Sequence, residues 1–382
     1  AGSDLQAVML KATYSEKDGC WLLNGVKRLL QTVMLIFTWY WLVRKKVQET
    51  VVVFLCSSMT RMRWCERTSY RKQTRYPRFS YLRTGVQNAK AELCGDRKLG
   101  LIKYVMALMN GARLGIAAQS VGLSQAAYNE GLAYAKDRKQ FGKAIIEFPA
   151  VYDMLAIMKG KLDAGRALLY QTARYVDIYK ALDDITRERK LTPEERQEQK
   201  KYAKLADSFT PLAKGMNSEY ANQNAYDCIQ IHGGSGFMME YACQRIYRDA
   251  RITSIYEGTT QLQTVAAIRY VTNGSYIATI REFETIPCSP EMEPLMSRLK
   301  KMADKFEAST NAVKEVQDQE LLDFTARKLV EMAADIIMCH LLIQDASKSS
   351  ELFSKSAHVY LNYAEAEVEK HSNFIENFDK ED

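Results

Sequence analysis

Apolar residues recur at helical spacing through most of the chain after residue 100. Two long stripes proceed in steps of three, four or seven residues, which places their side chains on one face of a helix. The stripes are Met109, Ala112, Ile116 and Leu123, and then Val151, Leu155, Met158, Leu162, Leu169 and Val176. We interpret both as core-facing surfaces of long helices, because most helical stability in a protein comes from packing such a face.

The first 28 residues have the shorter period of β-strands. Residues 7–14 and 20–23 are strand-like runs, and the Asp18-Gly19 pair between them is typical of a hairpin turn. Asn24-Gly25 indicates a second tight turn. This part of the chain therefore predicts the start of a β-rich domain.

Residues 29–86 fit neither pattern cleanly. They hold two apolar runs, 33–43 and 51–55, and a basic stretch, 61–83, with eight lysines and arginines against Glu66 alone. Because the whole chain has a formal net charge of +7, its positive charge is local to this stretch. Two buried strands followed by a loop explain the pattern. An aromatic and basic surface for a membrane or a nucleic acid is an alternative that we favour less.

Length and cysteine spacing limit the class of protein. A chain of 382 residues can form two or three domains, and no stretch reaches the roughly 20 apolar residues of a transmembrane helix. The eight cysteines are scattered without a Cys-x-x-Cys pair, which disfavours a zinc site. We expect reduced, mostly buried thiols, as in a cytosol or a mitochondrial matrix.

Two stretches divide the helical region. Residues 178–201 are highly charged and contain Thr192-Pro193-Glu194-Glu195, a capping box with proline at the first helical position, so a helix begins there. Residues 285–290 contain two prolines and predict a boundary. The rest of the chain has helical periodicity, and nothing in it indicates chemistry.

The strongest candidate for chemistry lies between residues 248 and 263, where Glu257 stands directly before Gly258. Thr259 offers a hydroxyl that can cap a helix whose apolar positions continue to Tyr270. A carboxylate held at the start of a helix can act as a base when burial raises its pKa. Taken alone, a glutamate here is more typical of a solvated turn, so the context decides.

Two further motifs supply that context. Residues 138–143, Arg-Lys-Gln-Phe-Gly-Lys, taken alone predict a charged helix end closed by Gly142. Residues 230–237, Gln-Ile-His-Gly-Gly-Ser-Gly-Phe, form a glycine-rich turn without the setting of a dinucleotide fold or a P-loop. Its glycines allow backbone to approach a ligand closely. His232 is more typical of a turn residue with a satisfied hydrogen bond than of a catalyst.

In this order the three motifs resemble those of acyl-CoA dehydrogenases, namely Arg-x-Gln-Phe-Gly, Gln-x-x-Gly-Gly and Tyr-Glu-Gly-Thr. The resemblance is strong over residues 88–275, partial over 1–28 and absent over 29–86. The family has an aromatic residue, isoleucine and Ser or Thr near the flavin where residues 29–31 are Leu-Leu-Gln. This abrupt break slightly favours a third interpretation of residues 29–86, that they are not the natural sequence.

The resemblance implies an α+β, mostly α fold of the longer type in this family. We expect a middle β-barrel domain over residues 1–98, with 29–86 atypical. A four-helix-bundle catalytic and FAD-binding domain would follow over 99–275, and a C-terminal helical extension over 276–382. The family's N-terminal helical domain is missing from this sequence, which also lacks an initiator Met, so we interpret the chain as a fragment.

The activity implied by the resemblance is α,β-dehydrogenation of an acyl-CoA thioester to the trans-2-enoyl-CoA. Glu257 would take the α-proton while the β-hydrogen leaves as hydride to N5 of FAD. A backbone N–H and the flavin ribityl chain would stabilise the enolate-like charge on the thioester. An apolar pocket would raise the pKa of Glu257 and protect the reduced flavin from oxygen.

The resemblance also assigns contacts residue by residue. The FAD contacts that it implies are Ser3, Arg138, Gln140, Phe141, Gln230, Gly233, Gly234, Thr259 and Gln261. Those within residues 138–141 and 230–234 would bind the FAD of a partner subunit, with the Arg138 guanidinium on the diphosphate. The substrate contacts that it implies are Asn110, Arg113, Tyr256 and Gly258. A structural ion pair is an equal alternative for Arg113, and no metal is implied.

As partners, the resemblance implies an electron-transfer flavoprotein and further copies of the chain, in a homodimer or homotetramer. It implies fatty acid β-oxidation in a bacterial cytoplasm or a mitochondrial matrix. We expect no nucleic acid, whereas peripheral membrane association stays open because of the basic stretch. Two rival functions also stay open: an acyl-CoA oxidase, and a non-catalytic assembly or membrane-associated partner on the same fold, against which an intact Glu257 argues.

Overall fold

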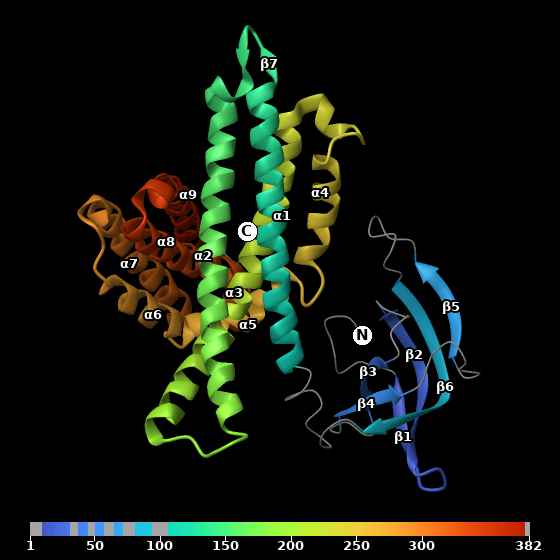
Figure 1. Ribbon diagram of the computed structural model, residues 1–382. Coiled ribbons are helices and arrows are strands. Elements are labelled where there is room, and N and C mark those ends of the chain that lie inside the picture. Colours follow the sequence, from blue (N-terminus) through green and yellow to red (C-terminus); the bar gives the residue numbers. More distant parts are fainter. Residues whose placement is uncertain are drawn as a thin grey trace. The chain divides into compact units, whose positions relative to one another are not determined.

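The computed structural model of the chain describes residues 10–30, 37–44, 50–56, 65–71, 81–93 and 106–378. The chain divides into two compact units, residues 1–112 and residues 113–382. Strands make up most of the described residues of the first unit, and helices most of those of the second (Figure 1).

A six-stranded antiparallel sheet forms the first unit. Its longest strand, β6 (Tyr81–Leu93), pairs with β2, β4 and β5, and the main path through the sheet is β1-β2-β6-β4-β3. The other strands are β1 (Lys11–Ser15), β2 (Cys20–Leu30), β3 (Phe37–Arg44), β4 (Thr50–Cys56) and β5 (Cys65–Arg71). Alternate residues such as Trp21 and Leu23, or Ala89 and Ala91, are buried, as expected for strands with one face in a core.

The predicted hairpin at the start of the sheet is confirmed. β1 pairs with β2 so that Ser15 lies opposite Cys20, and Gly19 has a φ of +63° in the turn between them. Glycine adopts this left-handed conformation without the steric cost that a side chain would add.

The second predicted turn, at Asn24-Gly25, is wrong. Both residues lie inside β2, where the pairing with β6 shifts register. The Asn24 side chain donates to Oδ1 of Asn88 on β6 (3.0 Å) and accepts from the Asn88 backbone N–H (2.8 Å). The Asn-Gly pair therefore forms a bulge that keeps the two strands together instead of reversing the chain.

Residues 29–86 contain more strand than expected. β3 and β4 coincide with the two apolar runs, as predicted. β5 and the first residues of β6, however, fall in the basic stretch, so the loop expected there is wrong over residues 65–71 and 81–83. The reason is non-local, because these residues pair with each other across the sheet.

Nine helices follow in the described residues 106–378, with no helix among them long and apolar enough to cross a membrane. Five end before residue 275: α1 (Met106–Asp137), α2 (Pro149–Ile185), α3 (Pro193–His232), α4 (Cys243–Ala250) and α5 (Thr260–Thr272). Four follow: α6 (Ser275–Glu284), α7 (Glu293–Glu315), α8 (Gln319–Lys348) and α9 (Ser350–Glu376). Short elements connect them, namely β7 (Lys139–Gln140), β8 (Lys143–Ala144), η4 (Ile145–Glu147), η5 (Gly233–Phe237), η6 (Arg251–Ser254) and η7 (Pro290–Met292).

The predicted start of α3 is confirmed in detail. The backbone N–H of Glu195 donates to the Thr192 hydroxyl (3.2 Å), and the Glu195 carboxylate accepts from the Thr192 N–H (2.9 Å). This reciprocal pair satisfies two backbone donors that a helix start otherwise leaves free. α3 then continues for 40 residues and packs along α2.

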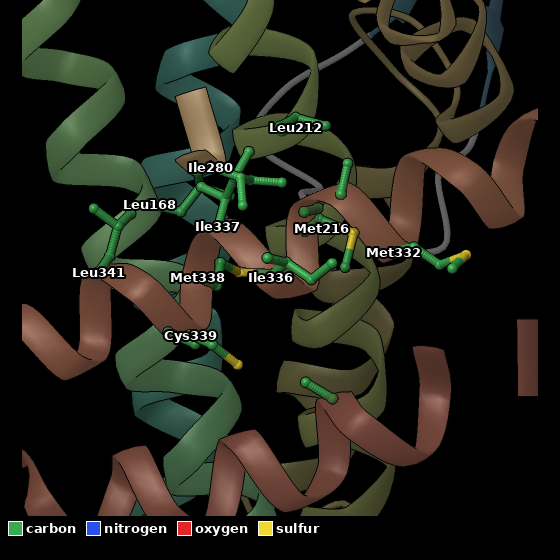
Figure 2. Close-up of a cluster of buried hydrophobic side chains, with 14 of the residues drawn as sticks. Leu168, Leu212, Met216, Ile280, Met332, Ile336, Ile337, Met338, Cys339 and Leu341 are labelled. Carbon is green, nitrogen blue, oxygen red and sulfur yellow. The ribbon is translucent and has the colours of Figure 1, made fainter. Parts of the chain in front are cut away.

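One apolar core joins the helical bundle to the C-terminal helices. α8 is buried on nearly every side between residues 332 and 343, as is typical of a helix surrounded by other helices. Figure 2 shows its side chains meeting Leu168 of α2, Leu212 and Met216 of α3, and Ile280 of α6. Helices α6 to α9 are therefore part of the same folded body as α2 and α3.

A buried polar cluster crosses this core. The hydroxyls of Tyr220 on α3 and Tyr360 on α9 both donate to Oδ1 of Asp335 on α8, at 3.0 and 2.7 Å. Burial raises the pKa of Asp335 to about 7, although the two tyrosine hydroxyls favour its ionised form. One carboxyl thus ties three helices together and holds its proton much more tightly than an exposed aspartate.

This cluster predicts how stability depends on pH. The folded state binds the Asp335 proton more tightly than the unfolded chain, so the free energy of unfolding should fall as pH rises from about 4 to about 7. We expect Asp335→Asn, which cannot ionise, to lose that part of the dependence, by up to about 4 kcal/mol at about 1.4 kcal/mol per pKa unit. Urea unfolding between pH 4 and 8 measures the difference. Asp153→Asn, at an exposed position, is the control, and an equal slope for wild type and Asp335→Asn contradicts the prediction.

Candidate active site

The run around Glu257 forms a tight turn between η6 and α5. Glu257 has a φ of +54° and Gly258 a φ of +95°, so two successive residues adopt left-handed conformations. Such a φ is unfavourable for a residue with a side chain and persists only where the surroundings hold it. The Glu257 side chain is half-buried. The predicted base therefore sits on a strained backbone inside the helical unit.

Three side chains from three helices donate to the carbonyl groups of this turn. Nε of Arg113 on α1 donates to the Glu257 carbonyl (3.3 Å). Nζ of Lys214 on α3 donates to the Gly258 carbonyl (2.6 Å), and Nε2 of Gln263 on α5 donates to the same oxygen (3.0 Å). These bonds oppose the strain, because each carbonyl would lose a partner if the turn relaxed.

All three donors are removed from solvent. Arg113 is 7% exposed, Lys214 is 0% and Gln263 is 2%. Burial lowers the pKa of Lys214 to about 8, with attraction to Glu219 and Glu257 opposing the shift. Burial also lowers the pKa of Arg113, against attraction to Asp207 and Glu257. Two cations thus lie within electrostatic reach of the Glu257 carboxylate, on the inner side of the turn.

Neighbouring hydrogen bonds fix both ends of the turn. On the near side, the Tyr256 hydroxyl donates to Oε1 of Gln119 on α1. On the far side, the Thr259 hydroxyl accepts from the Leu262 N–H (3.4 Å), which confirms the predicted helix cap. The Thr260 hydroxyl donates to Oε1 of Glu219 on α3 (2.5 Å).

A pocket of about 780 Å³ opens beside the turn. Thr259 and Gln261, two of the predicted FAD contacts, line it. Its wall also carries cations and aromatic rings from α2, α3, α4, η6 and α8: Lys161, Tyr226, Tyr247, Arg251 and Arg327. Hydroxyl, amide and guanidinium donors suit phosphate and sugar oxygens, and tyrosine rings suit a flat base. The lining also contains the carboxylates Glu219 and Asp227, so its donors and rings suit the sugar and base of a nucleotide more than its phosphates.

A second cluster of predicted FAD contacts lies at the other end of α1. Arg138, Gln140 and Phe141 belong to the tip formed by β7 and β8, and the Gln230 and Gly233 motif ends α3. Tyr134 on α1 joins the two motifs, because its hydroxyl donates to Oγ of Ser235 (3.2 Å) and its ring stacks on His232 (4.2 Å between centroids). The predicted motifs of this cluster are thus side by side, and Tyr134 was not foreseen as their link.

Two local expectations in this cluster need comment. Gly142 does not close a helix as expected, because α1 ends at Asp137 and a two-residue hairpin turn follows with φ of +51° at Phe141 and +82° at Gly142. His232 has the structural role expected of it, since it is buried and its Nδ1 bonds to the Cys228 carbonyl (2.7 Å). At Gly233 a side chain would meet open space, so its φ of +58° is the constraint there.

The two clusters cannot meet within one chain. Arg113 and Tyr134 lie on the same helix, separated by 21 residues, which corresponds to about 30 Å at about 1.5 Å per residue. Arg138, Gln140, Gln230, Gly233 and Gly234 are exposed, and Phe141 is 94% exposed. The first cluster therefore contains Glu257, Arg113, Tyr256 and Gly258, with Thr259 and Gln261 next to it. The second cluster is separate from it.

Two further predicted contacts remain, Ser3 and Asn110. Ser3 is outside the described residues. Asn110 lies on α1 one turn before Arg113 and is half-buried, within the first compact unit. Arg113 reaches the turn through the Glu257 carbonyl, to which its Nε donates.

Three residues of this site were missed by the sequence analysis: Gln119, Lys214 and Gln263. Lys214 carried a usable signal, since it is the lone charge in a run from Phe209 to Met216 that is buried throughout. A lysine inside an apolar run is rarely left without a partner. No local pattern, however, indicates that its partner lies 44 residues further along the chain.

Comparisons with known proteins agree on one family. Residues 102–270 match the family described as "Acyl-CoA dehydrogenase, C-terminal domain", and residues 272–382 match "Acyl-CoA dehydrogenase C terminal". A 3-(aryl)acrylate reductase of Clostridium sporogenes is 36% identical over 46% of this chain and 40% of its own length. The caffeyl-CoA reductase-Etf complex subunit CarC of Acetobacterium woodii is 39% identical over 41% of this chain and 35% of its own length. The matched stretch thus spans less than half of the length of each of these curated relatives.

Solved structures share the fold. An acyl-CoA dehydrogenase of Bacillus anthracis, crystallised with FAD, superposes with a TM-score of 0.81 at 19% identity, over 98% of this chain and 67% of that one. ACDH-11 of Caenorhabditis elegans, in complex with C11-CoA, gives 0.77 at 20% identity, over 95% and 62%. Butyryl-CoA dehydrogenase of Megasphaera elsdenii gives 0.57 at 26% identity, over 70% and 64%. The predicted fold class, with its strand-rich first part and helical extension, is confirmed.

The turn predicts opposite effects for two glycine substitutions. At Gly258 the φ is +95° and an added Cβ would lie 2.7 Å from Nε2 of Gln263, so Gly258→Ala should reduce the free energy of unfolding by about 1–3 kcal/mol. Gly122 lies in α1 with open space around it, so Gly122→Ala should raise that free energy by about 0.5–1 kcal/mol. Urea unfolding of both variants measures the two signs. A Gly258→Ala protein as stable as Gly122→Ala contradicts the strained turn.

Proposed function

This chain belongs to the acyl-CoA dehydrogenase family, and we propose that it oxidises an acyl-CoA thioester between the α and β carbons, with Glu257 as the base. The observation that carries the proposal is the turn itself. It presents a half-buried carboxylate on a backbone held by three buried donors. Restricting a catalytic group to one geometry before the substrate arrives is a large part of how enzymes lower a barrier.

The residues of the turn would divide the work of proton removal. The Glu257 carboxylate would take the α-proton, and the buried Arg113 and Lys214 would hold the backbone that carries it. Both cations bond to backbone carbonyls, and they would thereby restrain the turn that carries the carboxylate.

FAD, when bound, would accept the β-hydrogen as a hydride. The pocket beside the turn would hold its nucleotide part, with Thr259 and Gln261 as hydrogen-bond partners. FAD and a CoA ligand occur in the solved acyl-CoA dehydrogenase and ACDH-11 structures with this fold. The likeness of fold supports the choice of cofactor, while the pocket residues support its place.

A second candidate is the reverse reaction, reduction of an enoyl-CoA. Two of the relatives are reductases, one of 3-(aryl)acrylate and one of caffeyl-CoA. The same turn serves this direction, because a protonated Glu257 can return the proton to the α-carbon. The caffeyl-CoA enzyme belongs to a complex with Etf, and an electron-transfer flavoprotein of Acidaminococcus fermentans shares the fold at a TM-score of 0.59 and 24% identity. An electron-transfer flavoprotein is therefore the partner that we propose for either direction.

We also propose that two copies of the chain share each cofactor. The observation that supports sharing is the separation of the two clusters of predicted FAD contacts at opposite ends of α1. Apolar side chains at the second cluster are left exposed, with Phe141 at 94%, Phe237 at 83% and Met239 at 80%. An exposed apolar patch of this kind suits a second copy of the chain.

The visible spectrum tests the activity. Wild-type protein reconstituted with FAD should show a flavin spectrum that an acyl-CoA bleaches under anaerobic conditions. Glu257→Gln should keep the flavin but bleach roughly 10²- to 10⁴-fold more slowly, which is the usual contribution of a general base. Bleached flavin that an enoyl-CoA reoxidises would favour the reductase. Glu188→Gln, at an exposed glutamate away from both clusters, is the control, and failure to bind FAD would rule out both enzymes.

Mixing two inactive variants tests the shared site. Glu257→Gln damages the turn and Arg138→Glu damages the second cluster, so a mixed dimer of the two keeps one intact site if the clusters come from different chains. Unfolding and refolding an equal mixture should restore about a quarter of the wild-type bleaching rate, as random pairing in a symmetric dimer requires. Each variant refolded alone is the control. No recovery in the mixture would contradict a site that is shared between two chains.

A further inference from the structure

Lys214 is an unusual residue for its position. It lies in the middle of α3, is 0% exposed, and is flanked along the helix by Phe209, Leu212 and Met216, which are also buried. Taking an ammonium group out of water is costly unless a partner compensates for it. A leucine or methionine would avoid that cost, so the charge at this place needs an explanation.

The direct partner of Lys214 is a backbone carbonyl and not a carboxylate. Its Nζ donates to the Gly258 carbonyl at 2.6 Å, and no carboxylate within residues 106–378 lies at ion-pair distance from it. Three charges face it at longer range: Glu219 on its own helix and Glu257 in the turn favour its charged form, and Arg113 on α1 opposes it. Its bond to the turn is therefore the contact that sets its position.

The Gly258 carbonyl in turn depends on Lys214. It precedes the cap residue Thr259, so it lies outside the hydrogen-bond ladder of α5, whose first bond joins the Thr259 carbonyl to the Gln263 N–H (3.1 Å). The acceptor is held by Lys214 and by the Gln263 side chain at 3.0 Å. A charged donor forms a shorter and stronger hydrogen bond than a neutral amide does, and the two distances follow that order.

We propose that Lys214 is a positioning residue, which aims the Glu257 carboxylate by fixing the Gly258 carbonyl and with it the left-handed turn. This inference rests on the proposed function for the meaning of Glu257, but its structural part does not. The φ of +54° at Glu257 is stable only while the carbonyls of Glu257 and Gly258 are both held. Arg113 holds the first carbonyl and Lys214 the second, while Gln263 donates to both, at 3.5 and 3.0 Å.

The test measures the turn and the chemistry separately. Lys214→Met removes the donor and keeps the length of the side chain. Hydrogen–deuterium exchange of the peptide covering residues 255–263, in protein without substrate, should become at least tenfold faster in this variant. The matched control is Asn217→Ala, one turn further along α3, which removes a buried donor to the Gly165 carbonyl (3.1 Å) and does not touch the turn. Exchange in that peptide no faster in Lys214→Met than in Asn217→Ala overturns the proposal.

Kinetics supply the readout that a merely structural role would not move. In the FAD-loaded protein, Lys214→Met should lower the limiting rate of flavin bleaching roughly 10²-fold and change the acyl-CoA concentration for half-maximal rate less than threefold. If the limiting rate and the half-maximal acyl-CoA concentration change by the same factor, or if neither changes, Lys214 is not a positioning residue. If the wild type is not bleached by any acyl-CoA while the exchange difference is present, the proposed activity fails and the role of Lys214 in the turn stands.

A second variant guards against misfolding. If Lys214→Met does not fold, Lys214→Gln keeps a polar group of shorter reach, and the same exchange result is expected because its amide cannot span the 2.6 Å contact. A double variant with Gln263→Leu checks the shared acceptor. Two donors to one oxygen should give non-additive exchange effects, and simple additivity contradicts the proposal.

Discussion

The left-handed backbone at Glu257 and Gly258 is the constraint on which the arrangement of the site depends. Such a turn is unfavourable in isolation, and the donors that hold it come from α1, α3 and α5. Each donor is buried, so none can exchange its carbonyl partner for water unless the packing around it opens. The turn therefore forms only when the three helices are packed together, and the geometry of the site depends on that packing.

The bundle in turn depends on the C-terminal helices. α8 is buried on nearly every side and contributes the centre of the main apolar core (Figure 2). Its Asp335 binds Tyr220, six residues after Lys214 on α3, so the helix that carries the positioning lysine is tied to α8 and α9. The extension is thus structural support for the site, in addition to supplying Arg327 to the pocket.

The exposed second cluster is the other group of predicted FAD contacts. Arg138 and the glycine-rich turn meet through Tyr134, at the far end of α1 from Glu257. Under the proposed function, a cofactor that needs both kinds of contact would be held between copies of the chain, and the exposed apolar residues at that tip suit such an interface. Sharing would also make binding of the cofactor and association of the chains support each other.

Local patterns along the chain predict the long helices, two of their caps and the candidate chemical groups. Thr192 and Thr259 cap where predicted, because capping is a contact between residues three apart. Glu257, Arg138 and the glycines were found because their motifs are local. Tertiary structure alone decided which groups meet: that Asn24 pairs with Asn88 in a bulge, that β5 pairs with β6, and that Lys214 and Arg113 reach the turn. Those contacts join residues far apart along the chain, and no spacing within a single segment specifies the distance between two helices.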